Sequence, residues 1–148
     1  MGYAGQKRTA TSWVIAQDVV YEELRDRLVA AVEELEVVDP GKETCQVGPM
    51  IEEDSRASTL KTLVRSGGSI LTGGKPLDRD GFYLEPTLVE VEHPKNSLTQ
   101  EEILAPVAAL LKAGSAEEAV QIANDVRQGL VAAVFTNDLD SAGVCRTA

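Results

Sequence analysis

The chain has 148 residues, of which 43% are hydrophobic and 26% are charged, and its formal net charge at pH 7 is −10. This length suits one globular domain with a hydrophobic core. The negative charge argues against nucleic-acid binding, because phosphate contacts need a basic surface. No apolar run approaches the roughly 20 residues of a membrane helix, and the first residues lack a signal-peptide pattern. We therefore expect a cytoplasmic protein that binds neither nucleic acid nor membrane.

The side chains that could form a metal site or a disulfide are sparse. Cys45 and Cys145 are far apart in the sequence and neither belongs to a C-x-x-C pair, so no metal site or disulfide is expected. His93 precedes a proline in a polar connection, which is typical of a surface loop rather than of a general base. The acidic residues between positions 22 and 36 are expected on a solvated helix face.

Apolar periodicity predicts two helices in the first half of the chain. The first begins at Asp18, the candidate N-cap, and residues 39–42 end it. The second covers about residues 52–65 and ends at the glycine pair 67–68. The apolar residues expected to face the core are Val20, Leu24, Leu28, Val32 and Leu35 in the first helix, and Ala57, Leu60 and Val64 in the second.

Short apolar runs predict strands between and after these helices. Residues 69–72 are expected to form a buried strand, residues 87–91 an alternating strand, and the segment after Pro106 another. The capping box that starts at Ser115 predicts a helix that Gly129 ends. A second buried strand is expected over residues 130–136, and a further helix is expected to start at residues 137–138.

The alternation of helices and strands predicts an α/β fold. We expect three layers, with a mainly parallel sheet covered by helices on both faces, in a single domain over residues 1–148. The sequence contains no P-loop, no G-x-G-x-x-G segment after a strand and no G-x-S-x-G elbow. Neither a nucleotide-binding fingerprint nor a serine hydrolase is therefore supported by the motifs.

Several segments together resemble the aldehyde dehydrogenase superfamily. Residues 5–14 (GQKRTATSWV) are similar to the nucleophile segment G-Q-x-C-x-A-x-S-R-V, and residues 100–107 (QEEILAPV) are similar to E-E-I-F-G-P-V. The other matching segments occur in the order of the family, at 48–49, 81–88, 123–125, 129–130 and 134–139. The resemblance covers essentially the whole chain, and its first segment is most similar to semialdehyde dehydrogenases.

The resemblance implies the fold of the aldehyde dehydrogenase catalytic domain. In that family a cysteine thiolate attacks the aldehyde, hydride passes to NAD or NADP, and a carboxylic acid is released. The matching position here is Arg8, which stays protonated and cannot be the nucleophile. Trp13 also departs from the family arginine, so we expect a pseudoenzyme that is inactive alone. Arg8 has two other interpretations. It could be a surface residue without a role, or it could bind an anion at a helix N-terminus.

The resemblance also implies vestigial cofactor contacts. Glu102 matches the glutamate that hydrogen-bonds the nicotinamide ribose, Leu104 matches its aromatic neighbour, and Ala105 replaces the usual glycine. An exposed acid is the other interpretation of Glu102. The family's dinucleotide-binding part, general base and oxyanion donor precede the matched region, and its oligomerisation strands follow it. We therefore expect a partial catalytic domain that binds neither NAD nor NADP tightly.

Two other functions stay open. A binding or regulatory module would cover its exposed apolar surface by forming a homo-oligomer or by docking on a full-length dehydrogenase. A different enzyme would use Lys7 and Arg8 to hold a carboxylate or a phosphate, although no acid–base pair accompanies them.

Overall fold

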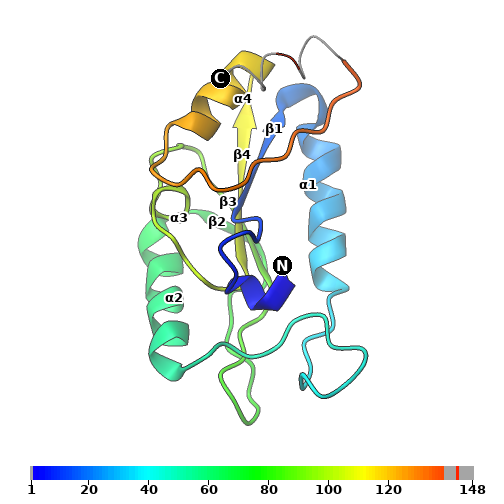
Figure 1. The fold of residues 1–148 in the computed structure, drawn as a ribbon, viewed down its shortest axis with the longest axis vertical. Coiled ribbons are helices and arrows are strands. Elements are labelled where there is room, and N and C mark those ends of the chain that lie inside the picture. Colours follow the sequence, from blue (N-terminus) through cyan, green and yellow to red (C-terminus); the bar gives the residue numbers. More distant parts are fainter. Residues whose placement is uncertain (1, 139–142, 144–148) are drawn as a thin grey trace.

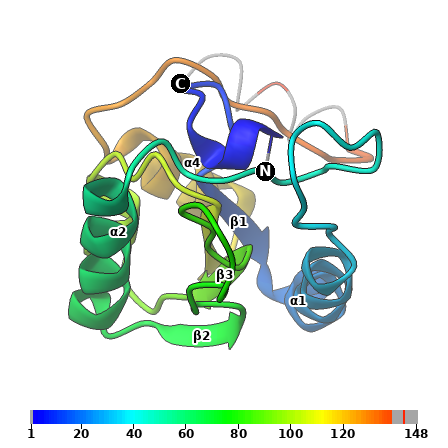
Figure 2. The ribbon, with the colours of Figure 1, turned by 90° about the horizontal axis from the view of Figure 1, so that it is seen from below.

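The computed structural model describes residues 2–138 and residue 143. Its centre is a four-stranded sheet of order β1-β4-β3-β2, and the parallel pairs are β1 with β4 and β3 with β4. Helix α1 (Asp18–Glu33) covers one face of the sheet, and α2, α3 and α4 lie on the other, as Figure 1 and Figure 2 show. The predicted three-layer α/β fold is thus confirmed. The remaining bounds are β1 (Trp13–Gln17), α2 (Glu53–Ser66), β2 (Ser69–Thr72), β3 (Thr87–Glu90), α3 (Ser97–Gln100), β4 (Val107–Ala113) and α4 (Ala116–Asn124).

Strand β4 supplies side chains to two separate hydrophobic clusters. Because successive strand residues point to opposite faces, its odd-numbered positions face α2, α3 and α4 while Ala108 and Leu110 face α1. Both faces are covered, which explains why six of the seven β4 positions are buried. The first cluster includes Leu63, Val89, Leu98, Val107, Ala109, Leu111 and Ile122, and the second includes Ala16, Tyr21, Leu88, Ala108 and Leu110.

The two long helices lie where the periodicity predicts, and the predicted residues Leu24, Leu28 and Leu60 pack against the two clusters, but one predicted position in each helix is wrong. In α1 Tyr21 is buried and Val20 is exposed. In α2 Leu63 is buried whereas Val64 is 85% exposed. The predicted burial of Val20 and Val64 is therefore wrong. Tyrosine and leucine remove more apolar surface from water than valine does, which favours the observed orientation.

The helix N-termini differ in how they are capped. Asp18 is the first residue of α1, and Gln17 before it makes no side-chain cap bond, so the predicted Asp18 N-cap is wrong. The predicted capping box is present at α4. The Ser115 hydroxyl accepts a hydrogen bond from Glu118 N, and the Glu118 carboxylate accepts one from Gly114 N. This pair of bonds satisfies two backbone donors at the start of the helix.

Two of the strand predictions are corrected. β2 has the predicted position, but it lies at the edge of the sheet with Ser69 and Ile70 exposed, so it is not a buried strand. Residues 130–136 form no strand and are all exposed, and α4 ends at Asn124 rather than at Gly129. An apolar run becomes a strand only when a neighbour pairs with its backbone groups, and no described strand pairs with this one. Residues 137–138 are not helical, and most of the helix predicted to follow lies outside the described residues.

The surface predictions are confirmed where the structure describes them. The acidic residues between positions 22 and 36 are exposed, and three of them pair with arginines on α1. His93 is exposed in the connection after β3. Within residues 2–138 and 143, no helix is long and apolar enough to span a membrane.

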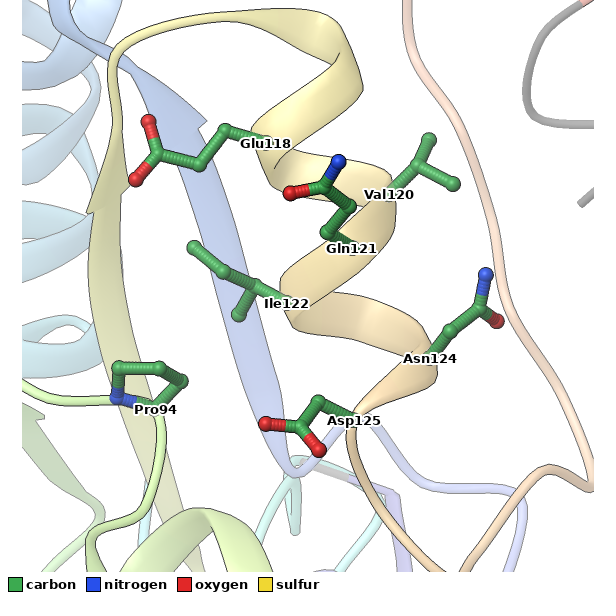
Figure 3. Close-up of a pocket in the computed structure, with 7 residues that line it drawn as sticks. All are labelled: Pro94, Glu118, Val120, Gln121, Ile122, Asn124 and Asp125. Atoms are coloured by element: carbon green, nitrogen blue, oxygen red, sulfur yellow. The ribbon is translucent and has the colours of Figure 1, made fainter.

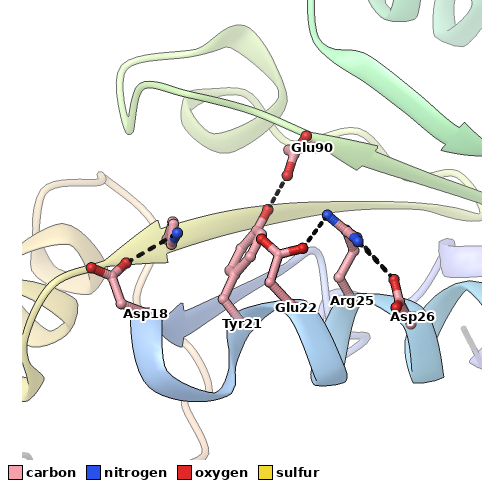
Figure 4. Close-up of polar contacts among 7 residues, drawn as sticks. Asp18, Tyr21, Glu22, Arg25, Asp26 and Glu90 are labelled. Carbon is pink, nitrogen blue, oxygen red and sulfur yellow. Dashed lines mark hydrogen bonds and ion pairs between the residues drawn. The ribbon is translucent and has the colours of Figure 1, made fainter.

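A hydrogen bond joins α1 to the sheet beside the second cluster (Figure 4). The Tyr21 hydroxyl donates to Glu90 Oε1 at 2.5 Å, across the gap between helix and strand β3. Burial of the ring, and then this bond to the carboxylate, raise the pKa of Tyr21 above its ordinary value. At the first residue of the same helix, Asp18 pairs with Lys112 of β4 at 3.5 Å. These contacts fix the position of α1 relative to β3 and β4.

We expect Tyr21→Phe to lower the free energy of unfolding by about 1–2 kcal/mol at neutral pH, because Glu90 loses its donor. The folded protein keeps Tyr21 protonated where the unfolded chain ionises it. Stability is therefore fully present below about pH 10 and is lost as the pH rises further. Phenylalanine should remove this part of the alkaline loss. Urea unfolding from about pH 7 to about pH 11 measures both effects.

Tyr3→Phe is the matched control, since the Tyr3 side chain is exposed and distant in sequence from α1. An equal response of the two variants would contradict the role given to the bond between Tyr21 and Glu90.

Candidate functional site

The first residues of the chain lie against the backbone that leads into β4. Gly2–Gly5 form a 3₁₀ turn, η1, in which Tyr3 and Ala4 have φ values of 55° and 53°. Gly5 has a φ of +71°, and a Cβ on it would lie 1.7 Å from the carbonyl oxygen of Ala105. Only glycine permits both this conformation and this close approach. Gly5 therefore brings residues 5–10 directly onto the Ala105 peptide.

Gln6 fixes the same segment from the other side. Its Nε2 donates to the carbonyl oxygen of Pro49 at 3.3 Å, and its Oε1 accepts from the backbone N of Ile51 at 2.8 Å. One side chain thus bonds to both ends of a short stretch that is more than forty residues away in the sequence. The sequence predicts no role for Gln6, and the available signal is its place directly after Gly5 in the motif.

Segments that carry the family resemblance meet at this corner of the molecule. The contact of Gly5 with Ala105 joins the first segment to residues 100–107. The bond from Gln6 to Pro49 joins it to residues 48–49. The backbone N of Met50 donates to the carbonyl oxygen of Phe82 at 2.9 Å, which adds residues 81–88. Four motifs that are separate in the sequence therefore form one region in space, which we call the motif corner.

Arg8 and Glu102 are neighbours on the surface of the motif corner. Arg8 Nε lies 3.8 Å from Glu102 Oε1, and the two side chains are 76% and 41% exposed. An ion pair this exposed contributes only about 0–1 kcal/mol to stability. It matters here because it shows that the Arg8 and Glu102 side chains are close together. The structure thus brings together the position that matches the nucleophile and the one that matches the ribose-binding glutamate. Arg8 lies in a turn before β1, not at a helix N-terminus, so that form of the anion-site interpretation is wrong.

The other departures from the family pattern lie in different environments. Leu104, two residues after Glu102, is 41% exposed. Ala105 is buried in the first cluster, and Trp13 is packed against that cluster from β1. The replacements at Trp13 and Ala105 therefore contribute to the core, whereas Arg8 and Leu104 change the surface at the corner.

Among the described residues, no cysteine thiol lies at the motif corner. Cys45 is a free, half-buried thiol whose Sγ donates to the carbonyl oxygen of Val38 at 3.3 Å, in the connection after α1. Cys145 lies outside the described residues. Among residues 2–138 and 143, no group of three or more His, Cys, Asp or Glu side chains is arranged to hold a metal ion.

An open groove on the described surface lies away from the predicted site residues. It has a volume of about 660 Å³ and lies beside α4, as shown in Figure 3. Its charged groups already have partners, because Glu118 accepts from Gly114 N and Asp125 pairs with Lys95. A smaller hollow of about 340 Å³ lies along the N-terminal turn, where Lys7 contributes to its wall. The residues that line the larger groove are Pro94, Glu118, Val120, Gln121, Ile122, Asn124 and Asp125.

Comparison with known proteins gives consistent matches. The sequence profile described as "Aldehyde dehydrogenase family" matches residues 1–147. An α-ketoglutaric semialdehyde dehydrogenase of Bacillus subtilis is 37% identical over 142 residues, which cover 91% of this chain and 29% of the relative. A 1-pyrroline-5-carboxylate dehydrogenase of Anoxybacillus flavithermus is 34% identical over 139 residues, covering 93% of this chain and 27% of the relative.

Solved structures agree with the sequence matches. A betaine aldehyde dehydrogenase of Staphylococcus aureus in complex with NAD+ superposes with a TM-score of 0.90 at 29% identity, over 99% of this chain and 32% of that protein. Aldehyde dehydrogenase 21 of Physcomitrella patens, in complex with the reaction product succinate, gives a TM-score of 0.87 at 33% identity, over 97% of this chain and 30% of that protein. The chain thus spans about a third or less of the relatives it matches.

We expect Gly5→Ala to destabilise the protein by roughly 2–4 kcal/mol, because it combines an unfavourable positive φ with overlap onto the Ala105 carbonyl. Gly2→Ala is the matched control, since a Cβ at Gly2 meets nothing within 4 Å. Thermal or urea unfolding of both variants measures the difference. Equal stabilities would show that the close approach of Gly5 does not hold the N-terminal segment in place.

Proposed function

Because the chain belongs to the aldehyde dehydrogenase family, we propose that it is a partial catalytic domain of that family which does not itself oxidise aldehydes. The family reaction is the NAD(P)-dependent oxidation of an aldehyde to a carboxylic acid. The single observation that carries the proposal is Arg8 at the nucleophile position. The segment around it keeps its contacts with the fold, as the approach of Gly5 to Ala105 shows. The fold supports the family, and Arg8 supports the loss of the chemical step.

The loss follows from the chemistry of the side chain. The family's first step needs a thiolate, which can share an electron pair with the aldehyde carbon and later leave from the thioester. A guanidinium stays protonated at physiological pH and has no free electron pair to donate. The free thiol of Cys45 donates a hydrogen bond to Val38 in another connection, so it offers no replacement at the motif corner.

The residues at the corner also fit the cofactor poorly. A carboxylate holds a ribose by accepting hydrogen bonds from its two hydroxyls, and Glu102 matches the family residue with that role. Here the nearest cation to this carboxylate is Arg8, at 3.8 Å, and its long side chain lies where a smaller cysteine would leave room. Leu104 offers an aliphatic side chain in place of an aromatic ring. We therefore propose that neither NAD nor NADP binds tightly at this carboxylate.

The chain is expected to show no NAD(P)-dependent oxidation of short semialdehydes, with a rate at least roughly 10³-fold below that of the B. subtilis relative assayed in parallel. Absorbance of the reduced cofactor measures the rate. Arg8→Cys should also be inactive, because it restores the nucleophile but not the cofactor contact at Leu104. Turnover by the unaltered chain would refute the proposal, and turnover by Arg8→Cys alone would show that the rest of the site is intact.

A thermal-shift titration tests the cofactor part separately. Binding to the folded state raises the melting temperature by mass action, so about 1 mM NAD or NADP should leave the melting temperature unchanged. The S. aureus protein, which is seen in complex with NAD+, is the positive control. Arg8→Ala and Lys7→Ala form a matched pair of removed cations. A shift in the unaltered chain would contradict the proposal, and a shift in Arg8→Ala alone would show that Arg8 blocks an otherwise working site.

A second function, as a binding or regulatory module, is favoured by one observation. Four large apolar side chains between residues 130 and 135 are exposed, which is costly unless a partner covers them. Such a module would associate with itself or with a full-length dehydrogenase. Sedimentation of the chain mixed with the B. subtilis relative tests the second arrangement, which is refuted if the two proteins sediment independently at micromolar concentrations.

A further inference from the structure

The N-terminal segment carries a charge opposite to that of the chain as a whole. The net charge of the chain is −10, but within residues 1–17 the only charged side chains are Lys7 and Arg8, and both are basic. Both residues are exposed at the motif corner. Two neighbouring exposed cations create a local positive potential, which attracts small anions to this part of an otherwise acidic surface.

The hydrogen-bond donors of Arg8 are unused. A guanidinium has five N–H donors in a planar fork. Arg8 Nε lies 3.8 Å from Glu102 Oε1, which is an ion pair but is too long for a hydrogen bond. In the described part of the chain, no acceptor receives a hydrogen bond from this side chain, which is 76% exposed. The two terminal nitrogens of the fork are therefore available to a ligand.

Lys7 is also a cation that no carboxylate neutralises among residues 2–138 and 143. Its Nζ lies 5.7 Å from the centre of the Tyr3 ring, and this cation–π contact leaves its N–H donors available. Lys7, Tyr3, Thr9 and Thr11 all line the hollow of about 340 Å³ along the N-terminal turn. The hollow therefore combines an ammonium group, two hydroxyl groups and an aromatic wall, and Arg8 lies between two of its lining residues in the sequence.

Geometry and charge favour a carboxylate over a phosphate at this place. The planar guanidinium fork matches the two oxygens of a carboxylate. Phosphate sites commonly use backbone N–H groups at a helix N-terminus, whereas Arg8 lies in a turn before β1. Lys7, Arg8 and Glu102 together carry one more positive charge than negative charge, which balances a monoanion. A phosphate carries more than one negative charge at pH 7, so the Glu102 carboxylate repels it more strongly.

We propose that the motif corner binds a small organic monocarboxylate. Its carboxylate group accepts hydrogen bonds from the guanidinium of Arg8 and the ammonium of Lys7, which are long side chains on consecutive residues. Its hydrocarbon part lies in the hollow, against the Tyr3 ring. The position that matches the nucleophile thus serves as an anion receptor formed by the side chains of a turn. The inference deepens the proposed function and rests on it only in that Arg8 is not a nucleophile.

An NMR titration of the ¹⁵N-labelled chain with sodium butyrate, without cofactor or aldehyde, tests the proposal. The amides of residues 7–11 should shift and saturate, with a dissociation constant of about 1–10 mM. Butyramide has nearly the same size but no charge, so it should cause no saturable shift. Inorganic phosphate at the same ionic strength should bind at least roughly fivefold more weakly than butyrate, because it matches the guanidinium fork and the local charge less well.

Substitutions identify the groups that bind the anion. Arg8→Gln and Lys7→Gln should each weaken butyrate binding by roughly fivefold or more, because each removes a charged donor. Glu102→Gln should instead tighten binding by roughly twofold to fivefold, because it removes a negative charge next to Arg8. Arg27→Gln is the matched control and should leave binding unchanged. The Arg27 side chain lies on α1 and is 77% exposed, so this substitution removes the same charge from an equally exposed site.

Several results would overturn the inference. They are the absence of saturable shifts, equal binding of butyramide or of phosphate, an equal loss of binding in Arg27→Gln and Arg8→Gln, and weaker binding by Glu102→Gln. None of them restores a nucleophile, so the proposed loss of aldehyde oxidation would stand. Aldehyde oxidation by the unaltered chain would refute the proposed function, and the butyrate titration would still decide whether the anion site exists.

Discussion

The pairing of β4 on both of its sides is the constraint on which the rest of the structure depends. A parallel strand in the middle of a sheet has both faces to cover, and β4 is apolar at all but one position. Its alternate side chains therefore define two clusters, one beneath α1 and one beneath α2, α3 and α4. The bond from Tyr21 to Glu90 then fixes α1 over the smaller cluster.

The motif corner is assembled at the entrance to the same strand. Gly5 can approach the Ala105 carbonyl because it has no side chain, and Gln6 ties the following residues to Pro49 and Ile51. These contacts act through the backbone, so the fold of the corner does not depend on which side chain occupies position 8. That independence explains how an arginine can stand at the nucleophile position while the surrounding architecture is kept.

The exposed segment 130–136 and the open edge of β1 share one physical cause. Backbone groups of a strand are satisfied by a neighbour, and in the described part of the chain neither element has one on the side concerned.

The sequence by itself determined the α/β class, the positions of both long helices and of β2, β3 and β4, the Ser115 capping box and the family. These follow from periodicity, local hydrogen bonding and motifs that neighbouring residues carry. Only the tertiary structure decided that Tyr21 and Leu63, rather than Val20 and Val64, face the core. It alone placed Arg8 beside Glu102 and left residues 130–136 without a strand partner. Such outcomes depend on which distant segments meet, and local pattern does not contain that information.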